Sequence, residues 1–337
     1  MKLHISSSPH IKSEQTVSTI MRDVVIALIP AGLVAIYYFG LRALAVIITC
    51  VVSAVISEIA ANKLFGIPVT ISDWSAIVTG MLLAYCLPPT IPLWIAALGS
   101  VFAIVIGKSV FGGLGKNIFN PAHVGRAFLL ASWPAVMTTW MRPVSFMSRS
   151  WFKLSSVDVT TMATPLGILK EGSISSGIEF LKYFKSHYGL SLWDMVTGNT
   201  GGCIGETSAI ALLIGAIYLF SKKHITWHIP APFILTVAIL SFFFGGKSFF
   251  DPYMMLIYLF SGGLFIGAFF MATDMVTSPT TPAGRVIFGF GCGLLVFLIR
   301  KFSASFPEGV CYSILIMNAF VPLIDKFTVP KKFGEVK

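Results

Sequence analysis

The stretch RALAVIITCVVSAVISEIAA, residues 42–61, decides the fold class, because charged side chains are almost absent from it. About 20 apolar residues in a helix span the roughly 30 Å hydrocarbon core of a membrane. Backbone groups find no water in lipid, so such a run must be helical. The whole chain is 55% hydrophobic and only 11% charged, whereas soluble domains carry about 25% charged residues. The sequence therefore predicts an all-α, polytopic membrane protein.

Apolar runs recur along the chain and predict about ten transmembrane helices in two five-helix halves. The third run ends in Leu87-Pro88-Pro89-Thr90-Ile91-Pro92, whose prolines break any helix. The expected spans are 22–39, 42–61, 75–88, 93–111, 121–137, 206–220, 229–245, 254–272, 283–299 and 309–327. The corresponding domains are an N-terminal segment 1–21, a first half 22–137, a loop 138–205, a second half 206–328 and a tail 329–337.

The basic residues indicate topology rather than nucleic-acid binding, although the net charge is +10. Most of them lie in segments that share one side of the membrane, which the positive-inside rule makes cytoplasmic. We therefore expect a protein of the cell inner membrane with both termini cytoplasmic and the loop 138–205 outside. Five spans per half imply inverted repeats. The likeness of residues 120–126 to residues 278–285 favours a parallel repeat instead, and both arrangements stay open.

No redox or metal centre is predicted from the side chains of this chain alone. The five cysteines are scattered and form no CxxC pair, so neither a zinc site nor an iron–sulfur cluster is expected. No GxGxxG follows a strand, so no NAD site is expected either. We therefore expect no metal ligands and no catalytic residues that act without partner subunits.

The most informative polar segment is Asp158-Val159-Thr160-Thr161-Met162-Ala163-Thr164-Pro165-Leu166, in the long loop. A threonine hydroxyl is a poor nucleophile without an activating base, and no histidine lies nearby. If Thr164 is modified, a separate enzyme does the work, and Pro165 favours the extended backbone that such an enzyme reads. Asp158 would position a metal or the donor pyrophosphate. The alternative is an ordinary loop rich in serine and threonine.

The segment resembles the flavinylation signature Asp-Gly-x-Ser/Thr-Gly-Ala-Thr of the Rnf and Na⁺-translocating quinone reductase families. Asp158, Thr161, Ala163 and Thr164 match, whereas Val159 and Met162 replace the two glycines. Further stretches resemble these families in the same order along the chain. They are residues 7–11, 20–24, 116–128, 198–209 and 272–279. The short N-terminal segment favours the Rnf D-subunit family over the quinone-reductase B subunit.

The resemblance implies a membrane subunit that carries FMN, joined through its phosphate to Thr164, as an electron relay. It also implies an Rnf complex that couples electron transfer between ferredoxin and NAD to Na⁺ or H⁺ translocation. The expected partners are other Rnf subunits, a flavin transferase and membrane lipid, and a second, noncovalent flavin is left open. Two alternatives are the quinone-reductase B subunit and a solute channel or permease similar to urea transporters, which the proline break also fits.

Several charged and polar residues are further candidates for the flavin site. Glu206 and Thr207 begin the sixth span, where they either cap the helix or lie among amides that hold flavin phosphate. Arg126 and Arg285 either bind a flavin or extend to the membrane interface. Asp274 is expected to be solvated, paired with Arg285 or functional. The remaining acids of this kind, Asp23 and Glu58, are expected to be solvated at the membrane boundary.

Overall fold

The computed structural model describes residues 15–66, 71–144, 146–148, 150–152, 161–171, 174, 176–206, 208–247, 249–303 and 309–330. Within these ranges the secondary structure is helical, apart from one isolated β-bridge between Met141 and Thr161. This confirms the predicted all-α, multi-pass membrane architecture.

The first half contains α1 (Val17–Phe39), α2 (Leu41–Leu64), η1 (Ile71–Asp73), α3 (Ser75–Tyr85), α4 (Leu93–Val105), η2 (Ser109–Phe111), α5 (Pro121–Ser132) and α6 (Pro134–Met137). The long loop contains α7 (Pro165–Glu171), α8 (Gly177–Tyr188) and α9 (Leu192–Thr197). The second half contains α10 (Ala209–Ser221), α11 (Pro230–Phe244), α12 (Pro252–Phe260), α13 (Leu264–Ile266), η3 (Gly267–Met271), α14 (Pro282–Phe302) and α15 (Val310–Thr328).

The helices differ from the predicted spans mainly in length. In the described part of the chain, five helical segments are long and apolar enough to cross a membrane, and a bent pair gives a sixth candidate. The bent pair joins α12 to α13 and η3 at an angle of 66°. Three further apolar helices, α3, α10 and α11, are shorter. The count of ten spans therefore stays a prediction.

Three predicted spans are shorter or divided for local reasons. The third ends at Tyr85 rather than at residue 88, because the prolines that follow cannot continue a helix. The fifth is divided at Trp133 and Pro134 into α5 and α6. The eighth is divided after Phe260, where the chain enters Ser261 and two glycines.

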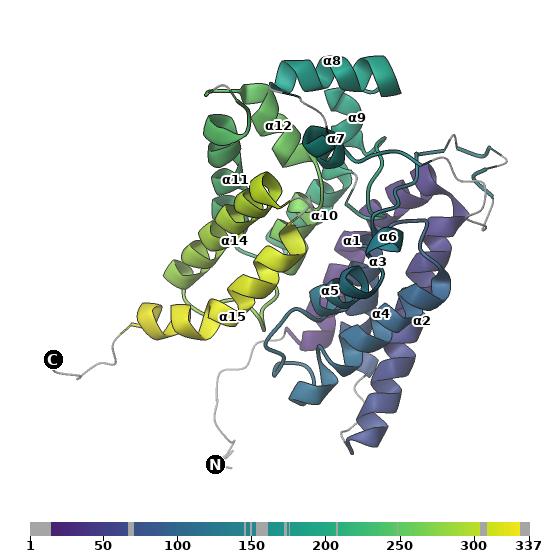
Figure 1. Ribbon diagram of the computed structural model, residues 1–337. Coiled ribbons are helices and arrows are strands. Elements are labelled where there is room, and N and C mark those ends of the chain that lie inside the picture. Colours follow the sequence, from purple (N-terminus) through teal and green to yellow (C-terminus); the bar gives the residue numbers. More distant parts are fainter. Residues whose placement is uncertain are drawn as a thin grey trace, which may run out of the picture.

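The two halves lie side by side and share one order of packing (Figure 1). Helix α2 packs against α3 and α4, and α11 packs against α12 and α14 in the same way. Helix α4 then contacts α5 as α14 contacts α15, and α1 and α10 join the halves. Residues 120–126 begin the fifth helix of this order but residues 278–285 begin the fourth, so their likeness does not follow the packing. Inverted repeats remain the prediction.

The loop helices lie at one end of the bundle. In Figure 1, α8 and α9 are at the top, whereas the start of α1 and the last turn of α15 are at the bottom. The described ends of the transmembrane bundle are thus on the face opposite to the long loop. This arrangement agrees with the predicted topology, although which face is cytoplasmic stays a prediction.

Each half contains a break in a helix, and at each break a different arginine donates hydrogen bonds to the freed carbonyl groups. Arg42, at the start of α2, donates to the carbonyls of Pro89 and Thr90, after α3. Arg300, at the end of α14, donates to the carbonyls of Tyr258 and Ser261, after α12. Non-helical backbone inside a membrane protein needs such partners because lipid offers none.

The first break also positions the turn that precedes α10. The amides of Ile204 and Gly205 donate to the carbonyls of Leu87 and Tyr85, at 2.9 and 3.0 Å. Gly205 lies against the Tyr85 ring so closely that no Cβ would fit. The turn 200–206 is therefore fixed against the centre of the bundle, directly before the candidate site.

Candidate functional site

Thr164 is the residue that begins α7. Its Oγ1 accepts a hydrogen bond from the Gly167 amide at 3.1 Å, and its carbonyl accepts one from the Ile168 amide at 3.0 Å. Pro165 follows as the first helical residue, a position that suits its fixed φ. Thr164 is only 7% exposed. Its hydroxyl is thus held in one place on the wall of a small pocket.

Glycines leave the space in this pocket, which lies between the turn 200–206 and the break after α12. Gly201, Gly202 and Gly262 line it together with Thr164 and Glu206. A Cβ added to Gly201 would lie 3.2 Å from the Met162 side chain. A larger residue at position 201 would therefore crowd Met162, two residues before Thr164.

Glu206 connects this pocket to the first half of the protein. One carboxylate oxygen, Oε1, accepts a hydrogen bond from the Cys203 amide at 3.2 Å. The other, Oε2, lies 3.9 Å from Nη1 of Arg126, on α5. The Arg126 guanidinium also approaches the Cys203 sulfur at 3.6 Å. Because Glu206 and Arg126 are both buried, the pocket has a fixed, paired charge at its inner end.

The other residues of the predicted motif are placed around Thr164. Ala163 is half-buried beside it, whereas Thr161 is exposed and forms the bridge to Met141. Asp158 and Thr207 lie outside the described residues. Thr164, Ala163, Glu206 and Arg126 are thus the predicted residues that the structure brings together.

Arg285 does not line this pocket, so its role in binding a flavin stays a prediction. It begins α14, and its Nε donates to the Pro279 carbonyl at 3.1 Å. Arg300, which contacts the pocket wall at Ser261, lies fifteen residues further along α14, about 22 Å at the usual helical rise. Asp274 is not paired with Arg285 either; it accepts hydrogen bonds from Thr277 and from a neighbouring amide.

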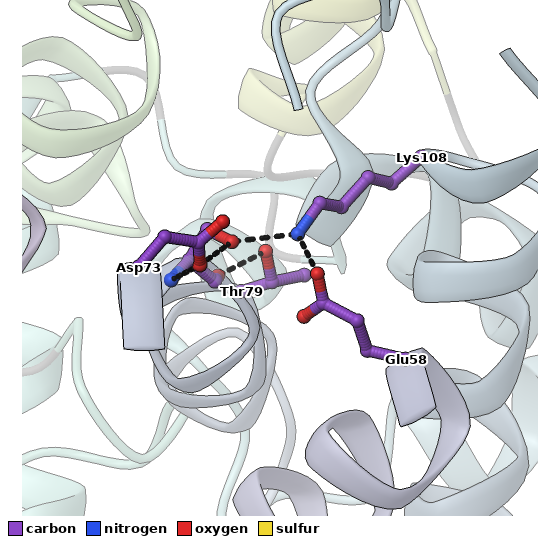
Figure 2. Close-up of polar contacts among 5 residues, drawn as sticks. Glu58, Asp73, Thr79 and Lys108 are labelled. Carbon is purple, nitrogen blue, oxygen red and sulfur yellow. Dashed lines mark hydrogen bonds and ion pairs between the residues drawn. The ribbon is translucent and has the colours of Figure 1, made fainter. Parts of the chain in front are cut away.

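The expectation that Asp23 and Glu58 are solvated is wrong, because both are buried and each contacts a partner side chain, a histidine for Asp23 and a lysine for Glu58. The Asp23 carboxylate lies 2.7 Å from Nε2 of His224. Figure 2 shows the Lys108 side chain directed at Glu58. Glu58 Oε1 lies 2.6 Å from the Lys108 ammonium, which also donates to the Ser75 hydroxyl at 2.6 Å. An acid within a membrane span is costly without a partner, so its presence in the sequence predicts a partner side chain. The sequence does not show which residue that partner is.

A second and larger space lies near the start of α1. This cleft has an empty volume of about 810 Å³ and a mostly apolar lining from α1, α3, α5 and η3. The polar groups that line it include Ser75, Lys108, Asn120, His224 and Asp274. It shares no lining residue with the pocket beside Thr164 and is therefore separate from it.

The family model described as NQR2, RnfD, RnfE matches residues 4–334, which include both halves and the loop. The chain belongs to this family. Among its relatives is the D subunit of the proton-translocating ferredoxin:NAD(+) oxidoreductase complex of Clostridium ljungdahlii. That relative is 49% identical to this chain, and the match covers 98% of the chain and 96% of the relative.

Two other relatives bear similar names. The D subunit of the Na(+)-translocating ferredoxin:NAD(+) oxidoreductase complex of Acetobacterium woodii is 46% identical over 100% of the chain and 97% of the relative. The D subunit of the ion-translocating oxidoreductase complex of Stutzerimonas stutzeri is 39% identical over 95% of the chain and 92% of the relative. Because the first two are named for different ions, similarity to these family members does not identify the ion for this chain.

Proposed function

We propose that this chain is the D subunit of an Rnf-type complex, which couples electron transfer between ferredoxin and NAD to translocation of Na⁺ or H⁺. Family membership and the names of relatives that align over nearly their full length support this assignment. The protein acts with other Rnf subunits in the cell inner membrane. Both of its termini are cytoplasmic, and residues 138–205 are outside.

We further propose that Thr164 carries FMN through a phosphoester bond that a separate flavin transferase makes. The observation that carries this proposal is the position of the Thr164 hydroxyl on the wall of a glycine-lined pocket. The absence of a side chain at Gly167 leaves the hydroxyl open on that side, because a Cβ there would lie 3.2 Å from Thr164 Oγ1 and restrict it. The FMN supplies one- and two-electron chemistry that side chains lack.

The residues around Thr164 bind and orient the group. Bond formation removes the hydroxyl proton of Thr164 and breaks the pyrophosphate bond of the flavin donor, whose second phosphate leaves with the rest of the donor. The Gly167 amide still has an oxygen to which it can donate. Gly201, Gly202 and Gly262 leave room beside the bond. Glu206, held by Arg126 and the Cys203 amide, fixes the shape and charge of the inner wall.

The transferase must reach Thr164 before α7 packs, because the hydroxyl is buried in the folded protein. We therefore place modification early, while residues 161–171 are still accessible as a peptide. The second, noncovalent flavin remains a proposal without assigned ligands. The apolar cleft near α1 is a candidate for it, because its volume of about 810 Å³ lies within the roughly 300–1,000 Å³ that small-molecule pockets usually have.

The test is a matched pair of threonine variants made in a host that also contains the flavin transferase. Thr164→Val should abolish ultraviolet fluorescence of the denatured band, whereas Thr138→Val should retain it because Thr138 is exposed and lies outside both the motif and the pocket. Both variants should insert into the membrane. Fluorescence that persists in Thr164→Val would contradict the attachment site.

The alternatives differ in simple measurements. A permease would be colourless after denaturation and would move solute in liposomes without partner subunits. A quinone-reductase B subunit would give the assembled complex a quinone-dependent activity. Ferredoxin-dependent NAD reduction that requires this chain would support the Rnf assignment.

A further inference from the structure

Three cationic side chains line one pocket at the end of α14, beyond the site of Thr164. The pocket has a volume of about 1050 Å³ and lies between α7, α12 and the ends of α11 and α14. Lys170 comes from α7, and Arg300 and Lys301 come from the last turn of α14. No carboxylate is among the described residues that line it.

Lys170 is the side chain that most needs a ligand. Its Nζ atom is buried and has no hydrogen-bond partner within the described ranges. Burial lowers the pKa of Lys170 because the charged form loses its water. A buried ammonium without a partner is costly, so a group that enters the pocket with acceptor oxygens would stabilise the folded protein.

The other two cations are held in position by backbone carbonyls. Arg300 is 2% exposed and donates to the carbonyls of Tyr258 and Ser261. The Lys301 ammonium donates to the Phe244 carbonyl at 2.9 Å. The carbonyl end of α14 contributes only about half of a negative charge. The pocket therefore keeps an excess of positive charge that suits an anion.

The rim of this pocket is apolar and faces outward. Phe244 and Phe302 are 44% and 74% exposed, and Lys301 lies 5.8 Å from the centres of both rings. Phe249 and Phe250, near the end of α11, are 67% and 63% exposed. Exposed rings beside a cationic pocket match a molecule with an anionic head and apolar chains, because each part then meets its preferred surroundings.

We propose that this pocket binds the phosphate group of an anionic phospholipid, with Lys170 as the buried donor and Lys301 as the donor at the rim. The lipid chains lie over Phe244 and Phe302. A phosphate group could also arrive as free phosphate or as the phosphate of a flavin on Thr164, and the experiment separates these sources. The site is distinct from the proposed flavin attachment and does not depend on it.

The experiment places the purified complex in nanodiscs of phosphatidylcholine that contain increasing fractions of phosphatidylglycerol. Phosphatidylglycerol that stays bound is measured by native mass spectrometry after transfer to detergent. Lys170→Gln and Lys301→Gln should each weaken retention about tenfold, as expected for one lost charge-assisted hydrogen bond. Lys170→Arg should restore it. Lys182→Gln is the matched control, because Lys182 is an exposed lysine on α8.

The outcomes are separated by two additional arms. In the first, retention that is unchanged in Thr164→Val supports a lipid site, whereas retention that rises in that variant would show that the flavin phosphate otherwise occupies the pocket and overturn the proposal. In the second, inorganic phosphate is added at millimolar concentration, and full displacement of the lipid would show a free-phosphate site instead. Equal retention by Lys170→Gln and Lys182→Gln would also overturn the proposal. Failure of Thr164 to carry flavin would leave the lipid result unaffected.

Discussion

Removal of the Lys108 ammonium should strongly destabilise the first half of the protein. Lys108 Nζ lies 2.6 Å from Glu58 Oε1, and both side chains are at most 3% exposed. At an effective dielectric constant of about 20, this separation corresponds to about 6 kcal/mol of attraction. Lys108→Met would leave the Glu58 charge buried, and breaking such pairs costs about 3–5 kcal/mol.

The same reasoning predicts that a second substitution restores stability. Lys108→Met combined with Glu58→Leu removes both charges, so no charged group remains buried without a partner. The double variant should recover most of the loss, because apolar replacements of buried pairs are often neutral or stabilising. Lys63→Met is the control, since Lys63 is an exposed lysine at the end of α2, the helix that also carries Glu58.

The assay is the fraction of monodisperse protein that remains after graded heating in detergent, measured by fluorescence-detected size exclusion. The expected order of stability is wild type and Lys63→Met first, the double variant next and Lys108→Met last. If Lys108→Met is as stable as Lys63→Met, or if the double variant is no better than Lys108→Met, the buried pair is not the cause and the argument fails.

Three further predictions follow from particular contacts. A Cβ on Gly263 would lie 2.6 Å from a Glu206 carboxylate oxygen, so Gly263→Ala should lower stability by about 1–3 kcal/mol, measured as a lower melting temperature in detergent, while covalent flavin in the denatured-gel assay stays unchanged because attachment precedes packing. Arg42→Gln should lower the melting temperature in detergent, because the carbonyls that follow α3 lose a charged donor. Burial alone would raise the pKa of Asp194, but hydrogen bonds from neighbouring groups lower it overall. The resulting stabilisation of α9 is present above about pH 4 and is lost as the pH falls through the depressed pKa of the folded state. When the pH is lowered below about 4, the melting temperature of Asp194→Asn should therefore fall by less than the melting temperature of wild type.

Local features of the sequence predict the helical class and one of the two breaks. The apolar runs predict helices, and three prolines between Leu87 and Leu93 predict where α3 ends. The break after Phe260 carries no proline, and its apolar sequence favours a continuous span. There the bend depends on Arg300, which donates to the freed carbonyls from another helix, and such a contact leaves no local signal.

The motif that contains Thr164 predicts the centre of the candidate site, and Glu206 and Arg126 are predicted as flavin-site residues without being placed beside it. Composition does not indicate that Glu206 lines the same pocket, since 42 positions separate the two residues in the sequence. The partners of the buried acids are further apart still: His224 contacts Asp23 across 201 positions, and Lys108 contacts Glu58 across 50. Pairing of this kind is decided by how helices pack, which one sequence does not specify.

The pocket beside Thr164 lies where it does because membrane proteins confine irregular backbone to protected sites. A break exposes carbonyl and amide groups, which lipid cannot satisfy, so a break persists only against protein or a cavity. The break after α12 gives one wall of the pocket, through Ser261 and Gly262, and the turn before α10 gives another. That turn is itself bonded to the end of α3, at the other break. Both breaks thus converge on one place, and the loop that carries Thr164 closes over it. The bends that shorten α3 and α12 are therefore the features that create room for a ligand inside the bundle.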